Sequence, residues 1–327
     1  MNAKRVVVTG ANGFIGHHLC RMLIDRGARV TACIREQVAP SVFGNLANSL
    51  EICRLGTLKA PGSEFRAFES ADVVVHLAGR AHIMQETQKD PLGEFRKVNV
   101  DGTRSMVLTA LRCGVRRFIY LSSIKVNGEE TNGGAFTAED PPGFVDPYGR
   151  SKWEAEEALK EIANGSTLEW VIVRPPLVYG PGVRGNFLSL LNLAYHGIPL
   201  PLGGVRNRRS LVSAYNLCDF LCILVSHPAA ANQCFMVADS EDLSTPDLIR
   251  AVGAALGRPQ RMMSFPPSLL LKLSRLLGKE MAMQRLCSSL IVDRQKTSAL
   301  LNWRAPLSFD DGVHRTAEWF LEFRKQK

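Results

Sequence analysis

The sequence lacks several features that would place it in other protein classes. It has no apolar run long enough to span a bilayer, and no apolar leader precedes its first predicted strand. Its eight cysteines do not show zinc-ligand spacing, since Cys218 and Cys222 lie one helical turn apart without a second pair. We therefore expect reduced thiols, no metal site, no integral membrane segment and a cytoplasmic protein.

The charge pattern also excludes one class of partner. The chain has 327 residues and a net charge of +9, but its basic residues are scattered except at Arg206, Arg208 and Arg209. A nucleic-acid-binding surface normally gathers such residues on one face. We expect no nucleic-acid partner, and the local arginine cluster favours a small, phosphate-rich substrate.

The most informative stretch lies at residues 5–18. Val6–Val8 is a β-branched, wholly apolar run, typical of a parallel strand buried on both faces. It is followed by Gly10, Gly13 and Gly16 and then by helix-forming residues. Glycines there permit a tight turn, close approach of the backbone to a pyrophosphate, and close packing of the helix on the strand. This segment predicts a dinucleotide-binding site.

The end of the second predicted strand, residues 29–34, bears on which dinucleotide binds. An acidic residue at this place usually binds the ribose 2′-hydroxyl of NAD, whereas an arginine accommodates the 2′-phosphate of NADP. Here Arg35 comes first and Glu36 follows. We favour NADP(H) and keep NAD(H) as the alternative, with Arg35 then a surface residue.

Further along, the chain carries a tyrosine and a lysine four residues apart. Tyr148 and Lys152 follow Pro147 at a predicted helix start, so both side chains lie on one helical face. A nearby ammonium stabilises a phenolate and lowers the tyrosine pKa. Two earlier predicted strands, at residues 71–79 and 117–123, end in small or hydroxyl residues, and His76 within the first is interpreted as a hydrogen-bonded core residue.

Together these motifs resemble one family. The Thr9-Gly-x-x-Gly-x-x-Gly16 loop, Ser122–Ser123 and Tyr148-x-x-x-Lys152 are similar to the extended short-chain dehydrogenase/reductases, in the nucleotide-sugar epimerase/dehydratase branch. The resemblance implies an α/β fold: a Rossmann-type doubly wound parallel sheet over residues 1–174, and a smaller C-terminal α/β substrate domain over residues 175–327, with interleaved segments. It also implies a homodimer built by helices of the first domain.

The same resemblance implies roles for individual residues. Ser123, Tyr148 and Lys152 would be catalytic, with Ser123 binding the substrate oxygen. Residues 98–103 are predicted to open a helix, and Asn99 there would support the active site, although a helix-start asparagine is an equally physical interpretation. Thr57 stands where the family commonly has an adenine-binding Asp. The full cofactor-binding set would be Gly10, Asn12, Gly13, Phe14, Ile15, Gly16, Arg35, Leu77, Ala78, Gly79, Asn99, Ser122, Tyr148, Lys152, Pro175 and Val178.

Substrate-binding residues are also implied, mainly in the second half. Arg209 would grip the diphosphate of a UDP-sugar, because a guanidinium pairs bidentately with phosphate oxygens. The other members would be His82, Ser123, Asn186 and Leu200. The family's dehydratases carry an Asp-Glu pair after a threonine at the serine position; here the residues are Ser123-Ile-Lys-Val-Asn-Gly128, so dehydration is not expected.

Two reactions at C4 of a UDP-sugar fit these residues. One is reduction of a UDP-4-keto-6-deoxy-N-acetylhexosamine, giving a UDP-N-acetylquinovosamine-type product for surface polysaccharide synthesis; the other is 4-epimerisation of a UDP-hexose. Arg35 favours the reductase, because reductases consume NADPH whereas epimerases retain NAD. A non-catalytic NADP-binding regulator is the third hypothesis, and the presence of both Tyr148 and Lys152 disfavours it.

One segment near the C-terminus allows two interpretations. Residues 267–277 predict an amphipathic helix with basic residues. Such a helix can dock on a membrane surface or pack on its own domain, and we favour packing on its own domain.

Overall fold

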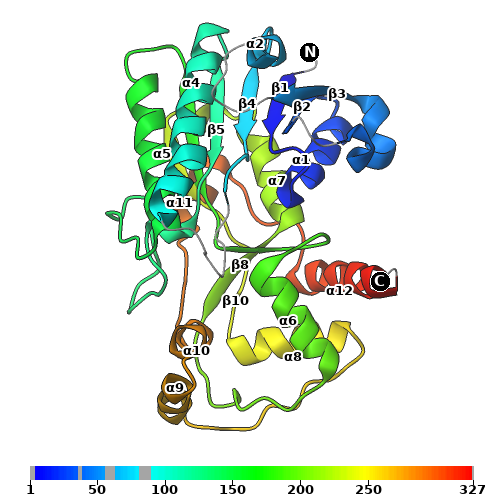
Figure 1. Cartoon of the computed structure of the whole chain (residues 1–327), viewed down its shortest axis with the longest axis vertical. Coiled ribbons are helices and arrows are strands. Elements are labelled where there is room, and N and C mark those ends of the chain that lie inside the picture. Colours follow the sequence, from blue (N-terminus) through cyan, green and yellow to red (C-terminus); the bar gives the residue numbers. More distant parts are fainter. Residues whose placement is uncertain (1–3, 36–38, 56–62, 81–89, 326–327) are drawn as a thin grey trace.

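The computed structural model describes residues 4–35, 39–55, 63–80 and 90–325. Within these ranges, seven parallel strands form one sheet in the order β3-β2-β1-β4-β5-β6-β9 (Figure 1). The strands are β1 (Arg5–Thr9), β2 (Arg29–Arg35), β3 (Leu50–Leu55), β4 (Val73–His76), β5 (Arg117–Leu121), β6 (Glu169–Arg174) and β9 (Gln233–Met236). The predicted doubly wound α/β fold is confirmed.

The order of the strands determines where a ligand can bind. The chain runs outward through β1, β2 and β3, and then returns to place β4 on the other side of β1. In open parallel sheets a crevice forms at this reversal, beyond the carboxyl ends of the strands. The residues after β1 and after β4 therefore face each other across the crevice.

Helices cover both faces of the sheet. On one face α1 (Phe14–Asp25) and α7 (Ala214–Leu224) pack over a core that includes Val8, Leu19 and Leu221. On the other face α2 (Ser63–Phe68), α4 (Gly102–Arg112) and α5 (Pro147–Ala163) pack over a core that includes Val7 and Phe118. Burial from both sides explains why the strands read as continuous apolar runs.

The second half of the chain builds a smaller α/β unit. Its three-stranded sheet has the order β10-β8-β7, and β8 is parallel to β7 but antiparallel to β10. The strands are β7 (Leu177–Tyr179), β8 (Arg209–Ser213) and β10 (Asp242–Leu243), and the helices are α6 (Gly185–His196), α8 (Thr245–Ala255), α9 (Pro267–Leu276), α10 (Glu280–Cys287) and α12 (Phe309–Lys325), while α11 (Gln295–Leu301) packs through Leu301 on the core of the large sheet. This unit occupies the lower part of Figure 1, whereas β9 returns to the large sheet.

Shorter helical segments complete the structure: η1 (Pro40–Ser49), α3 (Pro91–Phe95), η2 (Arg96–Asp101), η3 (Ile124–Val126) and η4 (Pro228–Ala230). All eight cysteines are free thiols, and Cys20, Cys33, Cys218 and Cys222 are buried. In the part of the chain that the structure describes, every helix is too short or too polar to traverse a lipid bilayer.

Candidate active site

The glycine loop between β1 and α1 adopts a geometry that only glycine tolerates. Gly10 has a φ of +66°, and a Cβ added there would lie 2.8 Å from the backbone nitrogen of Ala78. A Cβ added to Gly16 would lie 2.2 Å from the carbonyl oxygen of Gly10. The first glycine thus lets β1 and the segment after β4 approach each other, and Gly16 lets α1 start directly against the loop.

The start of α1 can accept an anion. Its N-cap is Gly13, so no side chain caps the first turn, and that turn carries no acidic residue. The free N–H groups and the positive end of the helix dipole therefore remain available for a pyrophosphate. Asn12, Phe14 and Ile15, the other predicted cofactor contacts of this loop, flank this position; Phe14 packs toward the second unit and Ile15 packs on the core of the large sheet.

Arg35 lies at the position that would discriminate the 2′-phosphate of NADP from the 2′-hydroxyl of NAD. It is the last residue of β2 and is exposed, and its guanidinium has no hydrogen-bond or ion-pair partner among the described residues. The N–H of Ala11 donates to the carbonyl oxygen of Cys33 at 3.3 Å, which holds the glycine loop beside the end of β2. Glu36 and Thr57, the other predicted contacts on this side, lie outside the described residues.

His76 is a hydrogen-bonded core residue, as interpreted from the sequence. Its Nδ1 lies 2.7 Å from Thr9 Oγ1 and its Nε2 lies 3.2 Å from Thr103 Oγ1, with the ring fully buried. Burial, aided by the positive charge of Lys152, lowers the pKa of His76 to about 3, so the ring is neutral. Because Thr9 Oγ1 also accepts from the N–H of Ala78, this network fixes the backbone after β4.

The segment after β4 reaches the lysine on α5. A Cβ on Gly79 would lie 3.1 Å from Asn99 Oδ1 and 3.7 Å from Lys152 Nζ. Leu77 packs on the large core, and Ala78 and Gly79 leave an open backbone edge. The structure therefore brings the glycine loop, residues 77–79 and Lys152 to one place, and this arrangement of small residues fits a flat nicotinamide dinucleotide.

Asn99 requires a correction. The sequence suggested that a helix opens at residues 98–103, but the helical run starts at Pro91, where Asp90 caps it by accepting from the N–H of Gly93. Asn99 lies inside this run, in the π-helical segment η2. A wide π turn re-aims side chains and often marks functional sites. The Asn99 side chain accepts from the N–H of Arg80 at 2.7 Å and donates to Ser151 Oγ at 2.9 Å, so the helix-start interpretation is wrong.

Ser123, Tyr148 and Lys152 converge at the carboxyl end of β5. Tyr148 and Lys152 lie one turn apart on α5, which Asp146 caps by accepting from the N–H of Gly149 at 2.7 Å. Tyr148 shares a hydrogen bond with Ser123, and its ring packs on Phe95. Lys152 is buried, donates to the carbonyl oxygen of Leu121 at 2.7 Å and lies over the Tyr120 ring.

Burial tunes the acidity of both groups in opposite directions. Removal from water raises the pKa of Tyr148 to about 12, although the hydrogen bond with Ser123 lowers it in part, so the lowered pKa expected from the Tyr148–Lys152 spacing is corrected: burial outweighs the nearby ammonium. Removal from water lowers the pKa of Lys152 to about 7, although the Glu156 carboxylate raises it in part. At neutral pH the tyrosine therefore carries its proton, and the lysine is poised between its charged and neutral forms.

The lowered pKa of Lys152 gives a first prediction, concerning stability. The folded state releases this proton near pH 7, while an unfolded lysine keeps it to above pH 10. Between these limits the unfolded chain binds more protons, so this group makes stability rise with pH. We expect the unfolding free energy of wild type, relative to Lys152→Met, to rise by about 1.4 kcal/mol per pH unit from pH 7.5 to pH 9. Urea denaturation at each pH measures this difference, and a flat difference would contradict the lowered pKa.

Glu156 is a site residue that the sequence reasoning missed. It is fully buried, accepts a hydrogen bond from the Ser122 hydroxyl, and pairs bidentately with Arg174 at 2.9 and 2.5 Å. Arg174 also donates to Asn127 Oδ1 at 3.1 Å, which ties β6 to the loop after Ser123. The signal was present in the sequence, because Glu156 continues the four-residue spacing of Tyr148 and Lys152.

The residues predicted to line the far side of the cofactor lie after β6. Pro175 is buried, and its carbonyl oxygen accepts from the N–H of Ile124 at 3.0 Å, next to Ser123. Val178 lies in β7 and packs on the large core. Both positions border the carboxyl ends of β5 and β6, where Ser123, Tyr148 and Lys152 also lie.

The predicted substrate residues are more dispersed. Asn186 is exposed in the first turn of α6, and Leu200 packs on the cluster that holds Leu270. Arg209 opens β8 and donates from Nη1 to the carbonyl oxygens of Arg285 and Ser288 at 2.7 and 3.0 Å. Burial and the neighbouring Arg285 lower the pKa of Arg209. His82 lies outside the described residues.

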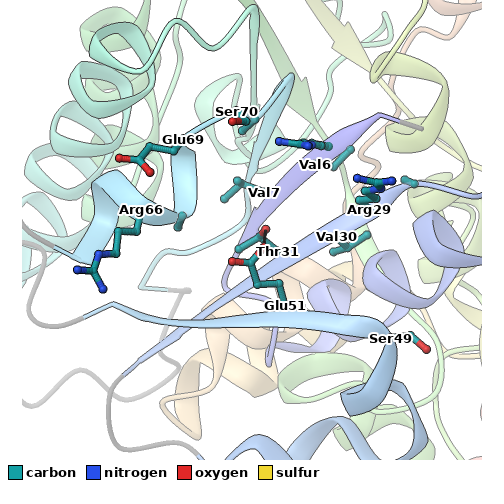
Figure 2. A pocket seen from close by; sticks show the side chains of 14 residues that line it. Val6, Val7, Arg29, Val30, Thr31, Ser49, Glu51, Arg66, Glu69 and Ser70 are labelled. Atoms are coloured by element: carbon teal, nitrogen blue, oxygen red, sulfur yellow. Dashed lines mark hydrogen bonds between the residues drawn. The ribbon is translucent and has the colours of Figure 1, made fainter. Parts of the chain in front are cut away.

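A hollow of about 580 Å³ occurs elsewhere, at the amino ends of β1 and β2 (Figure 2). Arg5, Arg29 and Arg66 line it together with Glu51 and Glu69, so its charges nearly cancel. Because the strands are parallel, this hollow lies at the opposite edge of the sheet from the Gly10 loop. The predicted site residues do not line it.

Taken together, these features define a class of protein. A doubly wound sheet with a glycine loop after its first strand, and a Tyr-x-x-x-Lys helix beside its fifth, is the architecture of the short-chain dehydrogenase/reductases. Within that class, residues 6–238 match the model of the NAD dependent epimerase/dehydratase family. The chain belongs to this family and is one of its enzymes.

Individual relatives agree with this placement. The chain is 39% identical to a UDP-glucose 4-epimerase of Vibrio cholerae, over 98% of this chain and 96% of that protein. It is 26% identical, over the same shares, to an N-acetyl-alpha-D-glucosaminyl-diphospho-ditrans,octacis-undecaprenol 4-epimerase of Escherichia coli O157:H7. The structure of UDP-glucuronic acid 4-epimerase from Bacillus cereus, in complex with NAD, has a TM-score of 0.77 at 20% identity and covers 98% of this chain and 99% of that chain.

Proposed function

We propose that this enzyme transfers hydride at C4 of a UDP-sugar, and that it reduces a UDP-4-keto-6-deoxy-N-acetylhexosamine to a UDP-N-acetylquinovosamine-type product. The observation that carries the proposal is the convergence of Ser123, Tyr148 and Lys152 beside residues 77–79. A bound reduced nicotinamide would supply the hydride. The residues of this chain would supply the proton and hold the keto oxygen.

Each catalytic residue has a distinct part in this reaction. The Ser123 hydroxyl binds the C4 oxygen of the sugar. Tyr148 donates its phenolic proton to that oxygen as C4 gains hydride, so the C=O bond becomes an alcohol. A pKa of about 12 keeps Tyr148 protonated at neutral pH, which suits the donor role. Lys152, with a pKa of about 7, stabilises the phenolate that remains after transfer.

The cofactor preference rests on Arg35. The family takes its name from NAD, but the exposed guanidinium at the end of β2, which has no partner among the described residues, suits the 2′-phosphate of NADP(H). We propose NADPH as the preferred reductant. The exposed position of Arg35 also means that replacing it leaves the fold intact.

The cofactor proposal gives a second prediction. We expect Arg35→Ala to raise the KM for NADPH about tenfold or more, because a charge-assisted contact of about 1.5–3 kcal/mol is lost. The KM for NADH should stay within twofold. Arg304→Ala, another exposed arginine, is the matched control and should change neither value. Equal effects of Arg35→Ala on both cofactors would contradict the NADP(H) preference.

A second candidate function has its own support. The UDP-glucose 4-epimerase of Vibrio cholerae, at 39% identity, favours 4-epimerisation of a UDP-hexose. The same three residues would serve it: Tyr148 would take the proton of the C4 hydroxyl and later return it to the same oxygen. A bound nicotinamide would take the hydride from C4 and, after the keto sugar rotates, return it to the opposite face of C4.

One assay separates the two reactions. We expect the purified protein to oxidise NADPH with repeated turnover when it is given a UDP-4-keto-6-deoxy-N-acetylhexosamine, as followed by nicotinamide absorbance. Interconversion of UDP-hexose 4-epimers without added reductant, together with no NADPH consumption, would replace the reductase by the epimerase.

A further inference from the structure

Exposed apolar side chains gather on one part of the second unit. They lie on the segment before α9, on α9 itself and on the first turn of α10, at the lower end of the molecule in Figure 1. Leu276, Leu277 and Met281 are 83%, 74% and 72% exposed. The whole set, called here the apolar surface, is Met263, Leu269, Leu273, Leu276, Leu277 and Met281.

The spacing on α9 shows that this exposure follows a pattern. Leu269, Leu273 and Leu276 are at positions i, i+4 and i+7, so they form one stripe along the helix. On the other side, Leu270 and Ser274 are buried against the protein. A helix that only packs on its own domain presents polar residues to water. Helix α9 instead presents a second apolar stripe, so packing on its own domain accounts for only one of its faces.

Cations border the apolar surface. Residues 263–281 include Lys272, Arg275 and Lys279, and Glu280 is the one acidic residue in this stretch. Arg275 pairs with Glu280, whereas Lys272 and Lys279 are exposed and have no ion-pair partner within the described ranges. Two exposed lysines beside exposed leucines match a partner whose core is aliphatic and whose border is anionic.

We propose that α9 and the start of α10 dock on the surface of an anionic lipid bilayer. The leucine stripe would enter the boundary between headgroups and acyl chains, and Lys272 and Lys279 would contact anionic headgroups. The charge of the bordering residues selects this occupant over a second copy of the chain, because two copies would bring lysines of the same sign together. The proposal rests on this surface and not on the proposed reaction.

The docking helices connect to the candidate active site. Met281 belongs to the apolar surface, and Arg285 lies one turn further along α10. Arg285 pairs with Glu129 at 3.1 Å, and its carbonyl oxygen accepts from Arg209. Glu129 also pairs with Lys125, two residues after Ser123. A docked α10 would therefore hold the substrate side of the site close to the membrane.

Vesicle flotation of the full chain tests the docking. We expect the protein to float with phosphatidylcholine vesicles that contain about 30% phosphatidylglycerol, more weakly with pure phosphatidylcholine, and less as salt increases. Leu273→Glu should reduce the partition coefficient about tenfold or more. Leu300→Glu is the matched control, since Leu300 on α11 is 42% exposed and Leu273 is 45% exposed. It should float like wild type.

Charge variants separate the two contributions. Lys272→Gln together with Lys279→Gln should weaken binding to the anionic vesicles by roughly fivefold per lysine and leave binding to neutral vesicles unchanged. Thermal melting and NADPH oxidation should match wild type in every variant, which shows that the fold is intact.

Three outcomes would overturn the proposal. The first is no flotation with anionic vesicles, and the second is unchanged flotation of Leu273→Glu. The third is a concentration-dependent oligomer, seen by sedimentation equilibrium, that Leu273→Glu dissociates while vesicles fail to bind. That last result would make the apolar surface an interface between copies of this chain.

Discussion

Tyr148→Phe is expected to lower kcat by about 10²- to 10⁴-fold, the usual contribution of a positioned general acid or base. The change removes the hydroxyl oxygen alone, and the ring keeps its contact with Phe95. The glycine loop and Lys152 are untouched, so the dissociation constant for NADPH should stay within about twofold. Stopped-flow nicotinamide absorbance measures turnover, and fluorescence titration measures cofactor binding.

A matched control makes this result specific. Tyr195→Phe removes a hydroxyl from a tyrosine on α6 whose ring packs on Phe320, away from the catalytic helix, and should leave kcat unchanged. If Tyr148→Phe retained full turnover, Tyr148 would not be the proton donor. If neither wild type nor Tyr148→Phe turned over substrate, and Tyr148→Phe kept the biological effect of wild type, the chain would be a cofactor-binding regulator instead.

Glu156→Ala is expected to destabilise the fold by about 3–5 kcal/mol, because it leaves the Arg174 guanidinium buried without its carboxylate. Arg174 is 5% exposed, and both of its contacts with Glu156 are hydrogen-bonded. Urea unfolding gives the free energy. Glu157→Ala is the matched control: Glu157 is exposed and pairs with Lys160, so the expected loss is about 0–1 kcal/mol.

A double replacement tests the cause of this loss. Glu156→Leu combined with Arg174→Met removes both charges and keeps apolar volume, so it should be less destabilising than Glu156→Ala alone. The loss of unfolding free energy in the double variant could instead equal the sum of the losses in Glu156→Leu and in Arg174→Met. That result would show that lost packing, and not the unpaired charge, causes most of the destabilisation. The Glu156 carboxylate also accepts a hydrogen bond from the Ser122 hydroxyl, just after β5. Glu156→Ala should therefore shift this end of β5, next to Ser123, and lower kcat as well.

Asn99 shows where the sequence pattern failed. The helix carrying it begins at Asp90–Pro91, a cap and first-turn proline that are a recognisable start signal. The prediction placed the helix start at residues 98–103 instead. The π-helical turn that aims Asn99 at Arg80 and Ser151 has no local sequence signature and depends on packing against α5.

Helix α9 shows what a sequence pattern leaves open even when the helix itself is predicted correctly. Its amphipathic pattern was visible in the sequence, and the helix forms where predicted. The pattern alone does not reveal which apolar stripe is covered, because that depends on what lies across from it. In the structure Leu270 meets the second unit, whereas Leu273 and Leu276 meet solvent.

The sequence by itself determined the features that depend on neighbouring residues along the chain. Buried parallel strands read as continuous apolar runs, the glycine loop is encoded by residues that only a tight turn needs, and a four-residue spacing places Tyr148 and Lys152 on one face. Only the tertiary structure decided the relations across the sheet: the Glu156–Arg174 pair beneath Ser122, the lowered pKa of Lys152, and the exposure of α9. These arise from burial between segments far apart in the chain, and burial is a property of the assembled fold.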